Sequence, residues 1–426
     1  MKRNLAIKIL LHPNTSDINF VSWIKIFFFS MIALYTMQPY FFWNKTVFQL
    51  FFAACVILCF IIQNSLNEFS ERIPLTSGYV ILFLLLFFTH WHFFKALNIE
   101  ANIFGIFGKI IFWFPPVLVF FLSTSDEKKV FLVFFTNIMA VLLFVSLLAF
   151  FFVLLGGHLP STRMQHPESK FYDFFENYKF FIVVHDKRNF SIFARFQSVF
   201  TEPGHLSMMT ALLLYANDYK IKKWQNFVIL ISLIFTFSLA GYVLLIAGVF
   251  LYSFAISKRK LPMVLLLIFI GCISIGLMFF YYNRHPDSLI SRTIISRLMP
   301  DEERGFSGNN RNTTQFKDTY REFIRENSFR TLTGWGNSIA KEFPKGGNSS
   351  YKNFIYENGF IGFFLLWIMY FAFTLGTKSF LPISFLFLFM LSFWQRPYAI
   401  WLSQMFIFMA YCAKYTSPSE IRNQNC

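Results

Sequence analysis

Acid–base side chains gather in one short stretch of the chain, RFQSVFTEPGHLSMMTALLLYA, at residues 195–216. Glu202 and His205 stand three positions apart, so a helix places them on the same side. Thr201 suits an N-cap and Pro203 is tolerated in a first helical turn, which predicts a helix that begins at Thr201. A carboxylate and an imidazole in this position can take up or release a proton.

The same helix start predicts an anion site. The N-terminus of a helix carries a partial positive charge and unpaired amides, and both favour a bound anionic group. Gly204 has no side chain where a ligand would approach the backbone, and Arg195 precedes the helix. The structural alternative stays open, in which Glu202 only completes the helix start and His205 reaches toward the membrane surface.

A second polar segment, residues 334–367, is a glycine-rich loop that leads into an apolar run. Ser349 or Ser350 is expected to cap the helix, which places Glu357 about two turns inside it. Small residues follow Glu357, and they suit close helix packing around a polar cavity. The alternative is a carboxylate that lies at the membrane interface without a function.

Cysteine and histidine spacing indicates neither a metal site nor a disulfide. Cys55 and Cys59 lie one helical turn apart inside an apolar run, as buried small side chains do. His158, His166 and His185 lack the spacing of metal ligands. We therefore expect no metal and no cofactor.

The chain that positions these residues is dominated by apolar runs. Of its 426 residues, 56% are hydrophobic and 14% are charged, whereas a soluble domain carries about 25% charged residues. The runs predict an all-α polytopic membrane protein that forms a single integral membrane domain, residues 1–426. The formal charge of +16 fits cytoplasmic loops rich in Lys and Arg, and no separate basic face indicates nucleic-acid binding.

The hydropathy pattern predicts about twelve transmembrane helices. Their expected bounds are residues 24–43, 46–62, 77–95, 103–122, 130–156, 201–217, 224–239, 241–257, 261–282, 353–376, 379–394 and 398–413. The run 226–256 would be about 46 Å long as one helix, well beyond a ~30 Å hydrocarbon core. Positive clusters on both sides of this run belong in the cytoplasm, which favours a hairpin broken near Ala240 and Gly241 over a single helix.

This topology puts both termini in the cytoplasm and two long segments outside. The first external loop is residues 157–200, and the second is residues 283–352. The second loop is rich in arginine, whose planar fork binds phosphate and pyrophosphate oxygens in pairs. The alternative is a solvated surface, because long translocated loops escape the positive-inside rule.

Three pieces of the chain resemble the Wzy-type O-antigen and capsular polysaccharide polymerases, within the wider group that includes the O-antigen ligases. The pieces are RFQSVFTEPGHLSMM, SLAGYVLL and a loop that closes with GWGNS and SSYKNFIYENGFIGFF. The resemblance covers residues 195–367, and the layout of many spans with two large periplasmic loops also looks like that family.

The resemblance implies glycosyl transfer at the periplasmic face of a bacterial inner membrane, in O-antigen or capsule biosynthesis. The substrates would be oligosaccharide repeat units carried on undecaprenyl pyrophosphate, and the growing chain would pass from one carrier to the sugar of the next. The lipid bilayer and a polysaccharide chain-length regulator would be further partners. Family members use periplasmic-loop arginines, which points here to Arg195 and Arg311. A family pattern in which an arginine precedes a glycine at a fixed spacing also fits Arg188 and Arg292.

In the mechanism that the resemblance implies, Arg311 and Arg195 stabilise the charge on the departing lipid pyrophosphate. The amides at Gly204 would add donors to the same group. Tyr351, in the SSYKNF piece, is expected to lie in the substrate site.

An acceptor hydroxyl needs a base in this mechanism. Glu202 is the first choice, with His205 or Glu357 behind it. Two other functions stay open, a flippase or transporter of lipid-linked oligosaccharide and an O-antigen ligase. The chain shows no internal repeat of the transporter type, and it reads GGNSSYKNF where the ligases carry a histidine.

Overall fold

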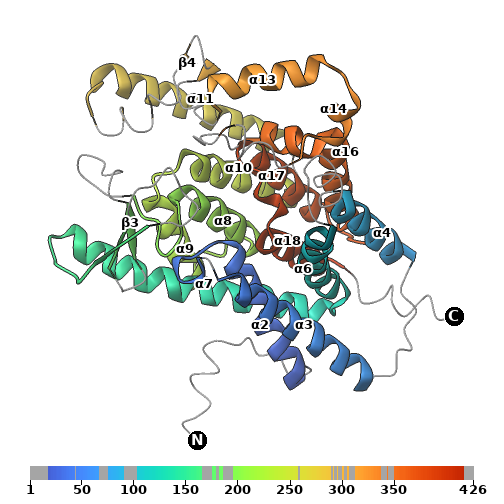
Figure 1. The fold of residues 1–426 in the computed structure, drawn as a ribbon. Helices are drawn as coiled ribbons and strands as arrows, with labels where there is room; N and C mark the ends of the chain where they lie inside the picture. Colours follow the sequence, from blue (N-terminus) through green and yellow to red (C-terminus); the bar gives the residue numbers. More distant parts are fainter. Residues whose placement is uncertain are drawn as a thin grey trace, which may run out of the picture.

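The structure is a computed structural model. It describes residues 18–43, 45–66, 75–90, 103–165, 175–178, 182–185, 195–257, 260–288, 291, 295, 300–301, 305–306, 312–336, 343 and 350–416. Within these ranges the chain is mostly helical, with fourteen α-helices arranged as in Figure 1. The helical architecture predicted from the apolar runs is therefore confirmed.

Many successive helices are joined by short connections, but long segments separate α7 from α8 and α11 from α13. They are α2 (Phe20–Thr36), α3 (Thr46–Leu66), α4 (Leu75–Thr89), α6 (Ile103–Leu122), α7 (Ser125–Leu154), α8 (Pro203–Ala216), α9 (Trp224–Phe235), α10 (Leu239–Ile256), α11 (Lys260–Arg284), α13 (Thr314–Arg325), α14 (Phe329–Thr333), α16 (Tyr351–Ala372), α17 (Leu381–Gln395) and α18 (Leu402–Ala413). Two 3₁₀ turns, η1 (Tyr40–Phe42) and η4 (Tyr398–Ile400), precede α3 and α18.

Short strands depart from the all-α prediction, and they lie only in the two long segments predicted as external loops. The first segment holds an antiparallel sheet of β1 (Thr162–Met164), β2 (Phe175–Asn177) and β3 (Val183–His185). The second holds the pair β4 (Pro300–Asp301) and β5 (Gly305–Phe306). Polar segments of this length satisfy their backbone groups by pairing with themselves.

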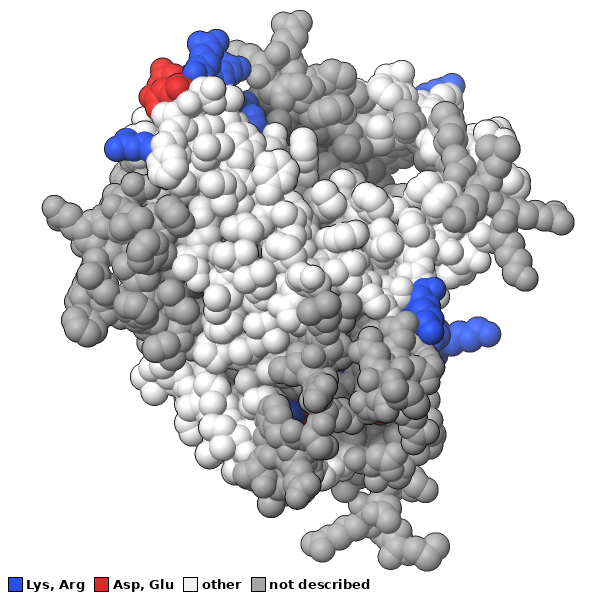
Figure 2. Space-filling model, turned by 90° about the vertical axis from the view of Figure 1, so that its right-hand side faces the viewer, with Lys and Arg blue, Asp and Glu red and all other residues white. Residues whose placement is uncertain are grey.

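Three helices, α7, α10 and α16, are long and apolar enough to cross a membrane among the described residues. Each of the twelve predicted segments contains one helix, but several of these helices are shorter than a span needs. The count of twelve spans therefore stays a prediction. Figure 2 shows one face on which uncharged side chains cover the middle, while most of the visible charged side chains lie toward its edges.

The apolar run at residues 226–256 is broken into two helices, as the charge pattern predicted. α9 ends at Phe235 and α10 begins at Leu239, so the break lies slightly before the predicted Ala240 and Gly241. Ser238 caps α10 by accepting a hydrogen bond from the Gly241 amide. A Cβ at Gly241 would lie 2.5 Å from the Ser207 Cβ, so this glycine lets α10 pack directly on α8.

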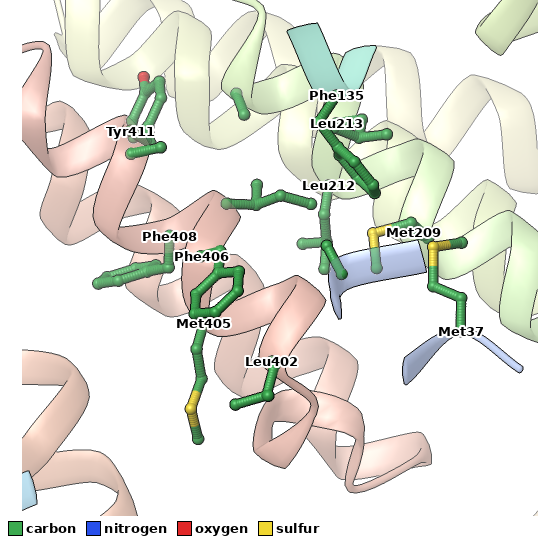
Figure 3. Close-up of a cluster of buried hydrophobic side chains, with 14 of the residues drawn as sticks. Met37, Phe135, Met209, Leu212, Leu213, Leu402, Met405, Phe406, Phe408 and Tyr411 are labelled. Atoms are coloured by element: carbon green, nitrogen blue, oxygen red, sulfur yellow. The ribbon is translucent and has the colours of Figure 1, made fainter. Parts of the chain in front are cut away.

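α8 and α18 form the centre of the core. Every residue of α18 is buried, and every residue of α8 except His205 is buried. Helices that are apolar on all sides bury all of those sides. Figure 3 shows Leu212 of α8 and Phe406 of α18 in one apolar cluster, together with Phe135 of α7.

A buried ion pair joins three helices near the start of α2. Lys25 Nζ lies 2.9 Å from a carboxylate oxygen of Glu127 on α7 and 2.5 Å from Gln63 Oε1 on α3. Glu127 also completes a capping box with Thr124 at the start of α7. The pair is saturated with hydrogen bonds, as a buried charge must be.

Candidate functional site

The helix that carries Glu202 and His205 begins one residue later than predicted. Glu202, not Thr201, is the N-cap of α8, with φ −143° and ψ 143°, and Pro203 takes the first helical position. The Glu202 side chain makes no capping bond with α8. Its carboxylate instead binds a residue far away in the sequence.

That distant residue is Arg396, which follows the last residue of α17. Arg396 Nη2 lies 2.5 Å from Glu202 Oε2. The arginine is only 6% exposed. Gly204 leaves room for it, since a Cβ there would lie 3.3 Å from Nη2. Burial lowers the pKa of Arg396, but the oxygens of Tyr398 and Glu202 raise it further, so the net pKa stands above its ordinary value. The guanidinium therefore stays charged.

Tyr398 links Arg396 to His205. Arg396 Nη1 donates to the Tyr398 hydroxyl oxygen, and the same hydroxyl is hydrogen-bonded to His205 Nε2. Trp401 stacks on the Tyr398 ring with centroids 4.0 Å apart and meets the His205 ring edge-on at 5.2 Å. The residues Glu202, His205, Arg396, Tyr398 and Trp401 are called the Glu202 cluster below.

Glu202 and His205 lie on the same side of the helix start, as their spacing predicted. His205 Nε2 lies 3.9 Å from Glu202 Oε2, and the side chains are 11% and 18% exposed. Glu202 and His205 are thus partly exposed, as are Tyr398 and Trp401, whereas Arg396 is buried. A carboxylate beside an imidazole can stabilise the charged form of that imidazole after it accepts a proton.

Sequence reasoning missed three of the five members of the Glu202 cluster. Arg396, Tyr398 and Trp401 lie in RPYAIW, at the boundary between two predicted spans. The usable signal was an arginine that directly follows an apolar run, since a charge at that depth needs a partner. The partner itself was 194 residues away.

Arg195 lies at the same end of α8 but binds a different element. Its Nε donates to the Thr236 carbonyl oxygen at 2.9 Å, at the turn between α9 and α10. This bond ties the segment before α8 to that turn. The other predicted arginines, Arg188, Arg292 and Arg311, lie outside the described residues.

Tyr351 contacts the end of α17, the helix that precedes Arg396. It is the first residue of α16, and Ser350 caps this helix as predicted. The Tyr351 ring stacks on Trp394 with centroids 4.3 Å apart. Trp394 stands two residues before Arg396 and is 64% exposed, so this aromatic pair lies at the surface of the protein.

The glycine-rich loop before α16 has a structural role. Gly359 has φ +66°, which interrupts the helix and leaves carbonyl groups without helical partners. The amides of Trp335 and Gly336 donate to the carbonyls of Tyr356 and Glu357 at 2.8 and 3.0 Å. Glu357 is half-buried, and its backbone thus anchors the loop. The structure does not bring Glu357 into the Glu202 cluster by any hydrogen bond between described residues.

Within the described part of the chain, no group of three or more metal-ligating side chains is found. Comparison with protein-family models, with curated proteins and with solved structures finds no match to the chain. The chemistry of the site is therefore argued from its geometry. That geometry is a carboxylate and an imidazole, held by a buried arginine and a tyrosine at the start of the central helix.

Proposed function

We propose that the chain is a membrane glycosyltransferase that joins oligosaccharide repeat units carried on undecaprenyl pyrophosphate. It would act as an O-antigen or capsular polysaccharide polymerase at the periplasmic face of a bacterial inner membrane. The resemblance of residues 195–367 to such polymerases suggests the reaction. The observation that carries the proposal is the 3.9 Å contact between Glu202 and His205 at the start of the central helix.

The reaction makes one glycosidic bond and breaks one bond to pyrophosphate. The acceptor hydroxyl oxygen forms the new bond to the anomeric carbon of the donor sugar. The bond from that carbon to the pyrophosphate oxygen breaks, and its electron pair leaves with the lipid pyrophosphate. The hydroxyl proton must pass to a base within hydrogen-bonding reach of the acceptor oxygen.

His205 takes the proton in this mechanism, although the sequence favoured Glu202. The Glu202 carboxylate is already hydrogen-bonded to Arg396 at 2.5 Å, so it is less available to take the proton, but its negative charge still lies 3.9 Å from His205. His205 is the one residue of α8 that is not buried. When the imidazole accepts the proton, the Glu202 carboxylate beside it stabilises the positive charge.

The arginines have separate tasks in this proposal. Arg396 holds Glu202 and Tyr398 in place and does not face the pyrophosphate. Arg195 and the loop arginines Arg188, Arg292 and Arg311 would stabilise the charge that develops on the leaving pyrophosphate.

The test is complementation of a strain that lacks the gene for this chain. The wild-type protein should restore long polysaccharide, while His205→Gln and Glu202→Gln should leave single lipid-linked repeat units. Arg195→Ala and Arg311→Ala should shorten or abolish the polymer. Matched controls are Glu326→Gln and His285→Gln, which change exposed residues at the ends of α13 and α11.

Three results would contradict the proposal. Full-length polymer from His205→Gln and Glu202→Gln at normal protein levels would show that these two residues do not form the catalytic site. A wild-type chain that moves lipid-linked sugar across the membrane without lengthening it would be a flippase. A chain that transfers finished polysaccharide from its lipid carrier to another acceptor would be a ligase.

A further inference from the structure

Five polar side-chain atoms beside the Glu202 cluster are buried, and they have no hydrogen-bond partner among the described residues. The atoms are Gln197 Nε2, Thr201 Oγ1, Arg396 Nε, Ser403 Oγ and Gln404 Oε1. Their residues are at most 6% exposed. They belong to residues 197–201, which directly precede Glu202, and to residues 396–404, which include Arg396, Tyr398 and Trp401.

Unpaired polar atoms of this kind are uncommon in a folded protein. A buried donor or acceptor that loses water and gains no partner destabilises the fold, so native structures leave few of them. Five such atoms, in the two segments that supply or adjoin the Glu202 cluster, indicate a place that a polar molecule completes. Leu402 and Met405, which flank Ser403 and Gln404 in the sequence, are apolar side chains of the core (Figure 3).

The charge of this place does not suit an anion. Arg396 is the one cation among the five, and its Nη2 is bonded to the Glu202 carboxylate. The guanidinium and the carboxylate together carry no net charge. A pyrophosphate would meet an arginine that is already neutralised and a carboxylate that repels it.

The mixture of donors and acceptors suits hydroxyl groups. Arg396 Nε and Gln197 Nε2 donate, Gln404 Oε1 accepts, and the hydroxyls of Thr201 and Ser403 do both. A phosphate oxygen accepts only and would leave the Gln404 oxygen unpaired. A sugar hydroxyl both donates and accepts, so a ring with several hydroxyls can pair with all five atoms.

We propose that these five atoms bind the hydroxyl groups of the acceptor sugar and hold its reacting hydroxyl beside His205. This inference rests on the proposed function and assigns the sugar, not the pyrophosphate, to this place. The stacked rings of Tyr398 and Trp401, with His205 edge-on to Trp401, form the apolar side of the same site.

The test uses the full-length chain in lipid nanodiscs and lipid-linked repeat units extracted from the deletion strain. Ser403→Ala and Gln404→Leu each remove one of the five atoms without touching the Glu202 cluster. Each should raise KM about fivefold, the loss expected for one hydrogen bond, with little change in kcat. The rise in KM separates substrate binding from a general loss of folded protein.

Ser232→Ala and Gln49→Leu are the matched controls. Ser232 Oγ and Gln49 Nε2 are also buried without a partner among the described residues, but they lie on α9 and α3. These controls should leave KM unchanged. If all four variants behave alike, the five atoms hold only water and the inference fails while the proposed function stands. A wild-type chain that leaves the repeat units unjoined overturns both.

Discussion

Arg396 and Glu202 are 194 positions apart in the sequence, yet Nη2 of the arginine lies 2.5 Å from Oε2 of the glutamate. This contact joins the end of α17 to the start of α8. The same guanidinium also donates to Tyr398, which is bonded to His205. One buried arginine therefore fixes both groups that can move a proton.

Arg396→Met should destabilise the protein strongly. The substitution leaves the Glu202 carboxylate without its cation, and removing one partner of a buried pair costs about 3 kcal/mol. The stability of Arg396→Lys should lie between that of this variant and that of the wild type. A lysine ammonium keeps the charge but lacks the planar pair of nitrogens that bonds both Glu202 and Tyr398. Thermal unfolding of the detergent-solubilised protein measures the difference.

The double variant Glu202→Gln with Arg396→Met provides the control for this prediction. Removing both charges leaves no unpaired ion, so the double variant should be more stable than Arg396→Met alone. Additive losses from the two substitutions would show that the residues do not interact.

Tyr398→Phe should lower activity more than stability. The phenylalanine ring can still stack on Trp401, but it loses the hydroxyl that joins Arg396 to His205. We expect polymerisation to fall about tenfold, as for the loss of a hydrogen bond to a charged group. The yield of folded protein should stay close to that of the wild type in size-exclusion profiles.

Tyr215→Phe is the matched control for Tyr398→Phe. The Tyr215 hydroxyl is buried and hydrogen-bonded to Ser384 near the opposite end of α8. Equal losses of activity in the two variants would mean that Tyr398 is only a packing residue.

The sequence predicted the helices well because apolar runs and caps are local signals. Ser350 was expected as a cap and caps α16, and the run 226–256 was expected to break and does so. Positions were less accurate. Thr201 was predicted as the N-cap of α8, but the cap is Glu202. Its side chain does not cap the helix and binds Arg396 instead.

The site was only half predictable for a physical reason. Glu202 and His205 are neighbours on one helix, so helical spacing alone places them together. Arg396 and Tyr398 reach them through the packing of α17 and α18 against α8, and a single sequence does not record such contacts. The role of Gly359 could not be predicted for the same reason, because Gly359 packs against the distant loop at Gly334.

Gly359→Ala should destabilise the protein severely. Gly359 has φ +66°, and a Cβ there would lie 2.0 Å from the Leu332 carbonyl oxygen and 2.6 Å from the Gly334 amide nitrogen. Both contacts are with backbone atoms, so the loop would have to move. We expect a loss of about 3 kcal/mol or more from overpacking and strain together, seen as a lower thermal midpoint.

Gly276→Ala on α11 is the control for this substitution. A Cβ at Gly276 would meet no atom within 4 Å, and the residue is helical. Alanine should be neutral or slightly stabilising there, by up to about 1 kcal/mol. A Gly359→Ala protein as stable as Gly276→Ala would show that the loop does not pack into the break of α16.

Lys25→Met should destabilise the end of the bundle where α2 and α7 begin. Glu127 would keep its hydrogen bond from Gln63 but lose the ammonium 2.9 Å away, in a site where the two side chains are 5% and 2% exposed. The expected loss is about 3–5 kcal/mol. Lys129→Met is the control. Lys129 pairs with Asp126 at an exposed position of α7, the helix that carries Glu127.

Tyr320→Phe should make the protein less sensitive to alkaline pH. Burial against the aromatic cluster of Phe316 and Phe323 raises the pKa of Tyr320 to about 12, and Tyr351 adds to this shift. An unfolded tyrosine has a pKa of about 10. The stability that the neutral phenol contributes is therefore complete below pH 10 and is lost as pH rises toward 12.

The thermal midpoint of the wild type should therefore fall more steeply than that of Tyr320→Phe between about pH 10 and 12. Phenylalanine keeps the ring that packs on Phe316 and lies under Lys352 Nζ, so the two proteins should differ little between pH 7 and 9. Parallel falls over the whole alkaline range would mean that the phenol is hydrated and that α13 does not pack on α16 as the structure has it.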